Sequence, residues 1–111
     1  MKKIISLIII LFGLCGCNKE DFDYKKIMSE NEYVIIDVRT KEEFNEGHVV
    51  DAINIPYDEI DENIEISKDT IIFVYCKSGN RSNMAYNNLM NLGYTVYDLG
   101  AYDTINLDKE K

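Results

Sequence analysis

One short segment of the chain combines residue types that could carry out covalent chemistry. Cys76 opens the run Cys-Lys-Ser-Gly-Asn-Arg-Ser at residues 76–82, directly after the apolar run Ile-Ile-Phe-Val-Tyr at residues 71–75. A cysteine thiolate is a nucleophile, and a glycine-bearing loop of small polar residues can bring main-chain N–H groups close to it. Such groups would stabilise an anion: the thiolate itself, a charged sulfur attached to it, or an oxyanion substrate.

The flanking patterns predict where this loop lies in the fold. Residues 71–75 are β-branched or aromatic, which is typical of a buried strand. Residues 81–92 have apolar side chains at positions 84, 85, 89 and 92, the spacing of a helix, and Gly93 is expected to end it. A loop between the carboxyl end of a parallel strand and the next helix is where open α/β sheets bind ligands.

Strand and helix patterns alternate along the rest of the chain. The expected elements are a helix at 22–29, a strand at 33–38, a helix from a Thr40–Glu43 capping box to about residue 45 with Phe44 facing inward and Gly47 as its stop, a short strand around 52–54, a short helix opened by Pro56, a last strand at 94–97 and a helical turn after Gly100. This alternation predicts the α/β class: a small parallel β-sheet flanked by helices on both faces. Residues 37–39 and Cys76 would then share the carboxyl edge of the sheet.

The first residues are expected to direct export. A basic start at residues 1–3 precedes an apolar stretch at 4–14 that is short for a membrane span and suits a signal peptide. The sequence Leu-Cys-Gly-Cys at 14–17 resembles a bacterial lipobox. That resemblance implies a lipoprotein signal peptide at 1–16, a lipid on Cys17, a tether at 17–21 and a domain at 22–111. The domain would then sit in the bacterial cell envelope, lipid-anchored on the extracytoplasmic face of a membrane; an uncleaved anchor helix is the alternative.

Cysteine usage directs attention to one thiol. The chain has three cysteines; Cys15 would leave with the signal and Cys17 would be acylated, so Cys76 would be the only remaining thiol. An unpaired cysteine in an exported chain indicates a reactive thiol, although free cysteines are also often buried structural residues. The glycine- and arginine-bearing loop favours reactivity.

The charge balance excludes one class of partner. The chain has 20 acidic and 12 basic residues, a net charge of −8, and loss of Lys2 and Lys3 with the signal would bring it near −10. Nucleic-acid binding requires clustered basic residues, so no nucleic-acid partner is expected. An anionic substrate would have to be attracted by local rather than overall charge.

An ordered set of motifs resembles the single-domain rhodaneses. Residues 36–39 (Ile-Asp-Val-Arg) with 42–44 (Glu-Glu-Phe), residues 46–56 (Glu-Gly-His-Val through Ile-Pro), and the loop 76–82 each resemble a family segment, and weaker matches follow at 92–94 and 99–102. The sequence departs from the family pattern where Val50 and Asp51 replace a usual Pro-Gly, where Ala101 replaces a common glycine, and where Ile105 stands near a frequent tryptophan.

This resemblance implies sulfurtransferase chemistry at Cys76. The cysteine would take a sulfane sulfur from a small donor anion such as thiosulfate, hold it as a persulfide, and pass it to a thiol or other thiophilic acceptor, with no cofactor beyond that covalent intermediate and no metal. Nearby cations and loop amides would stabilise the thiolate and the persulfide. The substrate-binding candidates are Lys77, Ser78, Gly79, Asn80, Arg81 and Ser82. Four residues separate Cys76 from Arg81, whereas the similar cysteine phosphatases use five, so phosphatase or arsenate chemistry is less favoured.

The supporting residues and two other functions stay open at this stage. Asp37 is expected to accept structural hydrogen bonds, Arg39 to pair with Glu43 or, alternatively, to touch substrate, and His48 to make a structural hydrogen bond rather than transfer protons. For Ser82, helix N-terminal hydrogen bonding is an alternative to a substrate role. Instead of turnover, the domain could act as a persulfide carrier or binding module for a membrane partner; a thiol redox function is disfavoured because a resolving cysteine is lacking.

Overall fold

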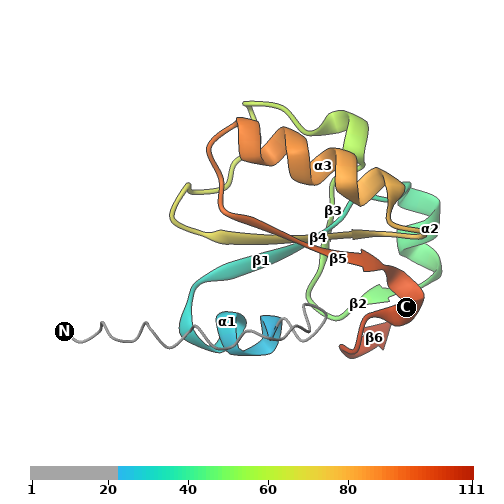
Figure 1. The fold of residues 1–111 in the computed structure, drawn as a ribbon. Coiled ribbons are helices and arrows are strands. Elements are labelled where there is room, and N and C mark those ends of the chain that lie inside the picture. Colours follow the sequence, from blue (N-terminus) through green and yellow to red (C-terminus); the bar gives the residue numbers. More distant parts are fainter. Residues whose placement is uncertain (1–22) are drawn as a thin grey trace, which may run out of the picture.

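The computed structural model describes residues 23–111, which form a four-stranded parallel sheet with helices on both faces. The strand order is β3-β1-β4-β5, with bounds Ile53–Asn54, Tyr33–Asp37, Ile71–Cys76 and Val96–Ala101. All three pairings are parallel, so the strands end at one edge, on the right in Figure 1. The predicted fold class is therefore confirmed.

Helices and short turns connect the strands. They are α1 (Tyr24–Glu30), α2 (Lys41–Glu46), the 3₁₀ turn η3 (Tyr57–Glu59), α3 (Asn80–Asn91) and the 3₁₀ turn η4 (Tyr102–Thr104). A separate antiparallel pair joins β2 (His48–Val49) to β6 (Lys109–Glu110). Within residues 23–111, no helix has the length and apolar character that crossing a membrane requires.

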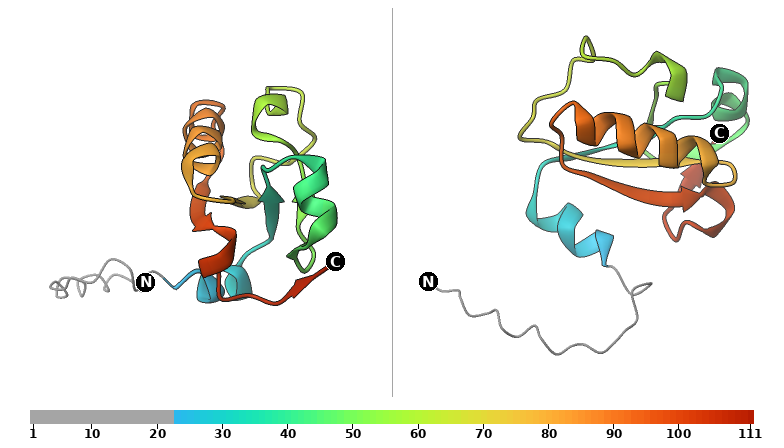
Figure 2. Two further views of the ribbon diagram at one scale, coloured as in Figure 1. Left: turned by 90° about the vertical axis from the view of Figure 1, so that its right-hand side faces the viewer. Right: turned by 45° about the horizontal axis from the view of Figure 1, so that its top comes forward.

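Two apolar clusters pack the two faces of the sheet. On one face, Ala85 and Leu89 of α3 lie among buried residues of β1, β4 and β5, and Cys76 belongs to this cluster. On the other face, Phe73 and Tyr75 pack with residues of α1 and α2 and with Ile105. Figures 1 and 2 show α3 and α1 on opposite sides of the sheet in each view. Side chains of β4 point alternately to the two faces of the sheet. Because both faces are covered, β4 is buried from Ile72 to Cys76.

Most predicted element positions are correct to within one or two residues. The Thr40 capping box is present, with both Thr40 Oγ1 and Glu43 Oε1 bonded to main-chain N–H groups, and Gly47 follows α2. The helix expected at 22–29 runs instead from Tyr24 to Glu30, because Asp23 accepts from the Lys26 N–H as its N-cap; residue 22 lies outside the described residues.

The last strand was predicted wrongly. It runs from Val96 to Ala101 rather than over residues 94–97, because the Tyr94 N–H still bonds the Leu89 carbonyl at the end of α3. Gly100, expected to lie after the strand, is inside it with a φ of 85°, next to a shift in the β4–β5 register. Glycine accommodates this irregularity without strain on a side chain.

The segment after α2 also differs from the prediction. One strand was expected around residues 52–54, but the chain forms β2 and β3 with a turn between them. Asp51 in this turn has a φ of 71°. Glycine favours this left-handed conformation and most other residues resist it. Asp51 therefore adopts a backbone conformation that glycine would adopt more easily.

Candidate active site

The loop between β4 and α3 holds the cysteine at the carboxyl edge of the sheet. β4 ends at Cys76, the helix begins at Asn80, and Gly79 between them has a φ of 102°. A side chain at Gly79 would meet no atom within 4 Å, so the backbone conformation alone makes glycine favourable there. This turn directs main-chain N–H groups of the loop back toward the cysteine.

Main-chain amides surround the sulfur atom. The Gly79 N–H donates to Cys76 Sγ at 2.9 Å. Burial raises the pKa of the Cys76 thiol, but hydrogen bonds from the Ser82 hydroxyl and from the amides of Ser82, Gly79 and Ser78 outweigh it, so the pKa is lowered from its ordinary value. The loop therefore favours the thiolate, which is the nucleophilic form.

The cysteine is also completely buried. Cys76 has an exposed fraction of 0%, as does Ser82. The Ser82 Oγ lies 3.2 Å from the Gly79 carbonyl oxygen and also within reach of the Cys76 sulfur, so its one hydrogen can turn to either acceptor. Within residues 23–111 Cys76 is a free cysteine. Cys76 differs from a structural apolar residue, because main-chain N–H groups of the loop donate hydrogen bonds to its sulfur. A substrate must reach it through a movement of the loop or its neighbours.

Arg81, expected to bind substrate, forms an ion pair with Glu43 that the sequence did not predict. Its Nη1 and Nη2 atoms lie 2.8 and 3.1 Å from Oε1 and Oε2 of Glu43 on α2. The hydrogen bonds from Arg81 lower the pKa of Glu43 to about 2, and Glu43 raises the pKa of Arg81. The prediction that Glu43 pairs with Arg39 was wrong. Much of the Arg81 charge is therefore directed to Glu43 rather than to the cysteine.

Arg39 pairs with Asp37 instead. Arg39 Nη2 lies 2.6 Å from Asp37 Oδ2, and both side chains are almost fully buried. The guanidinium also donates to the Gly47 carbonyl at 2.6 Å and lies 4.4 Å from the centre of the Tyr102 ring. Burial lowers the pKa of Arg39, but its hydrogen bonds with Asp37 outweigh this effect and raise it. Arg39 is therefore fully engaged in structural contacts.

Asp37 anchors a wider hydrogen-bond network beneath the loop. Its Oδ2 accepts from the Tyr75 hydroxyl at 2.8 Å, and the same hydroxyl accepts from the Val49 N–H at 3.0 Å. The expected role of Asp37 as a structural acceptor at a strand end agrees with this geometry. Sequence reasoning missed Tyr75, since its position in an apolar strand gave no sign of a polar partner.

The remaining candidates lie at the surface or away from the sulfur. Lys77, Ser78 and Asn80 are exposed, so Lys77 is a cation on the outer side of the loop. His48 lies with Nδ1 2.9 Å from the Phe44 carbonyl and its ring stacked on Phe44 at 3.8 Å. That placement matches the expected structural role. Cys17 is outside the described residues.

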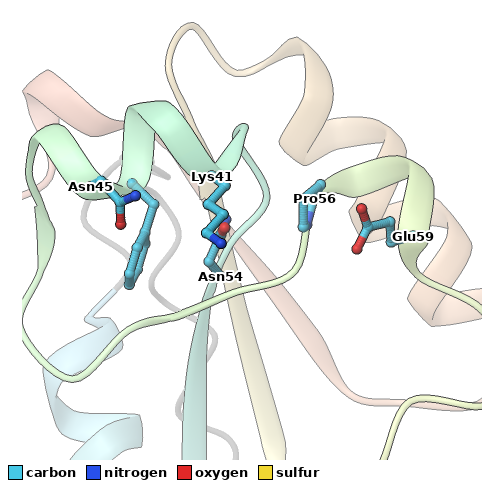
Figure 3. A pocket seen from close by; sticks show the side chains of 6 residues that line it. Lys41, Asn45, Asn54, Pro56 and Glu59 are labelled. Atoms are coloured by element: carbon cyan, nitrogen blue, oxygen red, sulfur yellow. The ribbon is translucent and has the colours of Figure 1, made fainter.

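One surface hollow borders the cysteine loop, and a second lies against α2. An open groove of about 710 Å³ borders the loop and is lined by Ser78, Gly79, Asn80, Asn83, Met84 and Asp98. A more enclosed pocket of about 370 Å³ lies between α2 and the β3–η3 segment, with Lys41 and Asn45 on one side and Asn54, Pro56 and Glu59 on the other (Figure 3). The pocket includes no residue of the cysteine loop. Within residues 23–111 no group of three or more His, Cys, Asp or Glu side chains is arranged to hold a metal.

Known proteins resemble both the sequence and the fold. Residues 22–104 match the Rhodanese family, described as the rhodanese-like domain. The chain is 39% identical over 80 residues to the thiosulfate sulfurtransferase PspE of Escherichia coli K12, covering 68% of this chain and 77% of that protein. It is 28% identical over 89 residues to the adenylyltransferase and sulfurtransferase uba4 of Ogataea parapolymorpha, covering 70% of this chain but only 23% of that protein.

Solved structures give the same picture. A rhodanese with anions from E. coli superposes with a TM-score of 0.66 at 33% identity, covering 71% of this chain and 98% of that one. The BH2092 protein of Bacillus halodurans superposes with a TM-score of 0.65 at 28% identity, covering 82% of this chain and 71% of that one. The chain spans about a quarter of the length of some curated relatives, including a probable molybdopterin-synthase adenylyltransferase of Porphyra purpurea, of which it covers 26%.

Proposed function

Because the chain belongs to the rhodanese-like domain family, we propose that it is a sulfurtransferase that works through a persulfide on Cys76. The donor is a small anion with a sulfane sulfur, such as thiosulfate, and the acceptor is a thiol or another thiophile. The observation that carries the proposal is the set of loop amides and the Ser82 hydroxyl that bond the Cys76 sulfur and lower the pKa of its thiol.

The first half-reaction loads the cysteine. The Cys76 thiolate attacks the sulfane sulfur of thiosulfate, forming a sulfur–sulfur bond while the bond to the sulfonate sulfur breaks and sulfite leaves with that electron pair. The negative charge then rests on the outer sulfur. Loop N–H groups stabilise it as an oxyanion hole stabilises oxygen.

The second half-reaction regenerates the thiolate. A thiophile such as cyanide attacks the outer sulfur, forms thiocyanate, and returns the bonding pair to Cys76. Here the hydrogen bonds from the Gly79 amide and the Ser82 hydroxyl assist, because they stabilise the departing thiolate. Lys77 adds a local positive charge that attracts the donor to an otherwise acidic chain.

A persulfide carrier with little turnover is the second candidate. The complete burial of Cys76 favours it, since a buried outer sulfur would be protected from small acceptors until a partner opens the loop. The two functions differ in rate: an enzyme turns over many times with thiosulfate and cyanide, whereas a carrier is loaded once and stays persulfidated.

One experiment tests both. The full chain is incubated with thiosulfate, and the mass of the peptide containing Cys76 is measured before and after cyanide, while thiocyanate is followed by colour. We expect a gain of one sulfur on Cys76, its loss with cyanide, and repeated turnover; Cys76→Ser should show none of these although Cys15 and Cys17 remain. Absence of the mass gain with thiosulfate and other sulfane donors would refute the persulfide proposal.

We also propose that the domain is held at the extracytoplasmic face of a bacterial membrane by lipid on Cys17. The support is the signal-like sequence of residues 1–16, outside the described residues. Lipid on Cys17 is tested by partitioning of the expressed full chain into a detergent phase, with Cys17→Ala as the variant that should remain in water. Equal partitioning of the two chains would contradict it.

A further inference from the structure

The open groove beside the loop has features that no step of the proposed reaction uses. Its lining residues Ser78, Gly79 and Asn80 belong to the cysteine loop, so a group lying in it contacts the outer side of the loop whose inner side holds the buried Cys76 sulfur. The opposite side is formed by Asp98 of β5, the last strand of the sheet.

The lining has an unusual balance of polarity and charge. Met84 exposes 49% of its surface and supplies an apolar contact within the groove. Asn80 and Asn83 contribute neutral amides, and Asp98 is the one charged residue of the lining. Asp98 Oδ1 accepts from the Gly100 N–H at 2.9 Å, which fixes the carboxylate, and Asp98 has no ion-pair partner among residues 23–111.

From these features we propose that the groove binds the sulfur acceptor, and that this acceptor is an extended polypeptide segment with a cysteine and uncharged or basic neighbours. The inference rests on the sulfur transfer proposed above. An open groove about twice the volume of the α2 pocket suits a chain segment, whereas small-molecule sites enclose most of their ligand. Met84 offers a flexible apolar contact that adapts to different side chains.

Charge selects against acidic segments. The Asp98 carboxylate and the net charge of −8 attract lysine or arginine beside the acceptor cysteine and repel glutamate or aspartate. In the transfer step, the acceptor thiol loses its proton to solvent and its sulfur attacks the outer sulfur of the Cys76 persulfide. The new bond joins the acceptor sulfur to the transferred sulfur, and the broken bond returns its electron pair to Cys76.

The test compares two peptides of eight residues with one central cysteine, flanked by lysines in one and by glutamates in the other. After loading with thiosulfate, the full chain should transfer sulfur to the lysine peptide with a kcat/KM about tenfold higher. Asp98→Asn, which keeps the oxygen that accepts from Gly100, should lower this ratio to the smaller preference that the overall charge alone gives, and an unchanged ratio would overturn the inference. Equal kcat/KM values for the two peptides with the unchanged protein would overturn the inference.

A matched pair of methionine variants isolates the apolar contact. Met84→Gln should lower kcat/KM for the lysine peptide about fivefold relative to 2-mercaptoethanol. Met90→Gln should leave it unchanged, because Met90 is 47% exposed on the same helix but does not line the groove. Equal effects of the two variants would also overturn the inference.

Binding measured without chemistry separates this inference from the proposed function. Fluorescent peptides with serine in place of cysteine cannot react, so their affinity reports the groove alone. Preference for the lysine version, reduced in Asp98→Asn, together with weaker binding in Met84→Gln, would support the groove even if Cys76 forms no persulfide. Persulfide formation without any such preference would support sulfur transfer and reject the groove as the acceptor site.

Discussion

Glu43 of α2 and Arg81 of α3 form a two-bond ion pair that ties the first helical turn after the cysteine loop to a neighbouring helix. The two residues are 38 positions apart in the chain. Each side chain is about one quarter exposed, and the hydrogen bonds of the Thr40 capping box also hold the Glu43 carboxylate in position. The pair therefore positions the loop from outside, while the sulfur is stabilised by amides from inside.

Removing this ion pair should loosen the loop. In Glu43→Gln we expect kcat/KM with thiosulfate to fall about tenfold, a loss of about 1.4 kcal/mol of transition-state stabilisation, because the loop amides are less well positioned. Glu42→Gln is the matched control, since Glu42 is exposed on the same helix turn. Steady-state rates of thiocyanate formation provide the measurement. Equal rates in both variants would mean that the pair contributes only to stability.

The same pair predicts how stability depends on pH. The pKa of Glu43 is about 2 in the folded protein, below the ordinary value of about 4.3 for glutamate. A lowered folded pKa means that the stabilisation is complete above about pH 4.3 and is lost as the pH falls toward 2. Because the pair is partly exposed, we expect about 1 kcal/mol. Urea unfolding at pH 7 and pH 3 should show the difference between wild type and Glu43→Gln shrinking at the lower pH.

Ser82 should set the basicity of the cysteine through its hydroxyl. Ser82→Ala removes that donor, so the pKa of Cys76 is expected to rise. Ser78→Ala should leave the pKa unchanged, because Ser78 contributes its main-chain amide, which the substitution keeps. The thiolate absorbance at 240 nm, followed against pH and corrected with Cys76→Ser, measures both. A rise in Ser78→Ala equal to that in Ser82→Ala would contradict the assignment.

Asp37 should matter for folding rather than for chemistry. Asp37→Asn leaves the buried Arg39 charge without its carboxylate, and we expect the free energy of unfolding to fall by about 3 kcal/mol. Tyr75→Phe removes one hydrogen bond to the same carboxylate and should cost about 1 kcal/mol. Urea unfolding tests both, with the exposed Asp103→Asn as a control. A neutral result for Asp37→Asn would show that the ion pair adds no net stability.

Asp51 offers a stabilising substitution. Its φ of 71° is one that glycine adopts without strain. Asp51→Gly should therefore raise the free energy of unfolding by about 0.5 kcal/mol, the relief of strain being partly offset by the greater entropy of glycine in the unfolded chain. Thermal unfolding of the variant checks this, and Asp51→Ala, which keeps a Cβ atom and therefore the backbone strain, should show no gain. A lower melting temperature in Asp51→Gly would indicate that the aspartate side chain stabilises the turn.

Local patterns in the sequence were sufficient for the elements and for the reactive loop. The apolar run at 71–75, the Thr40 capping box and the helical spacing after Cys76 each depend on residues within a few positions of one another. For that reason the strand, helix and loop positions could be predicted. The last strand was misplaced because Tyr94, apolar by type, is used to end α3.

The partners of the charged side chains were decided only by the tertiary structure. Arg39 and Glu43 are four residues apart and looked like a pair, but the fold brings Asp37 to Arg39 and Arg81 to Glu43. Such choices depend on which strand ends and helix turns meet in space, and no local pattern encodes them. The sequence therefore determined that Cys76 opens a loop between a strand and a helix, whereas packing of the sheet and helices determined that its sulfur is buried and which groups brace it.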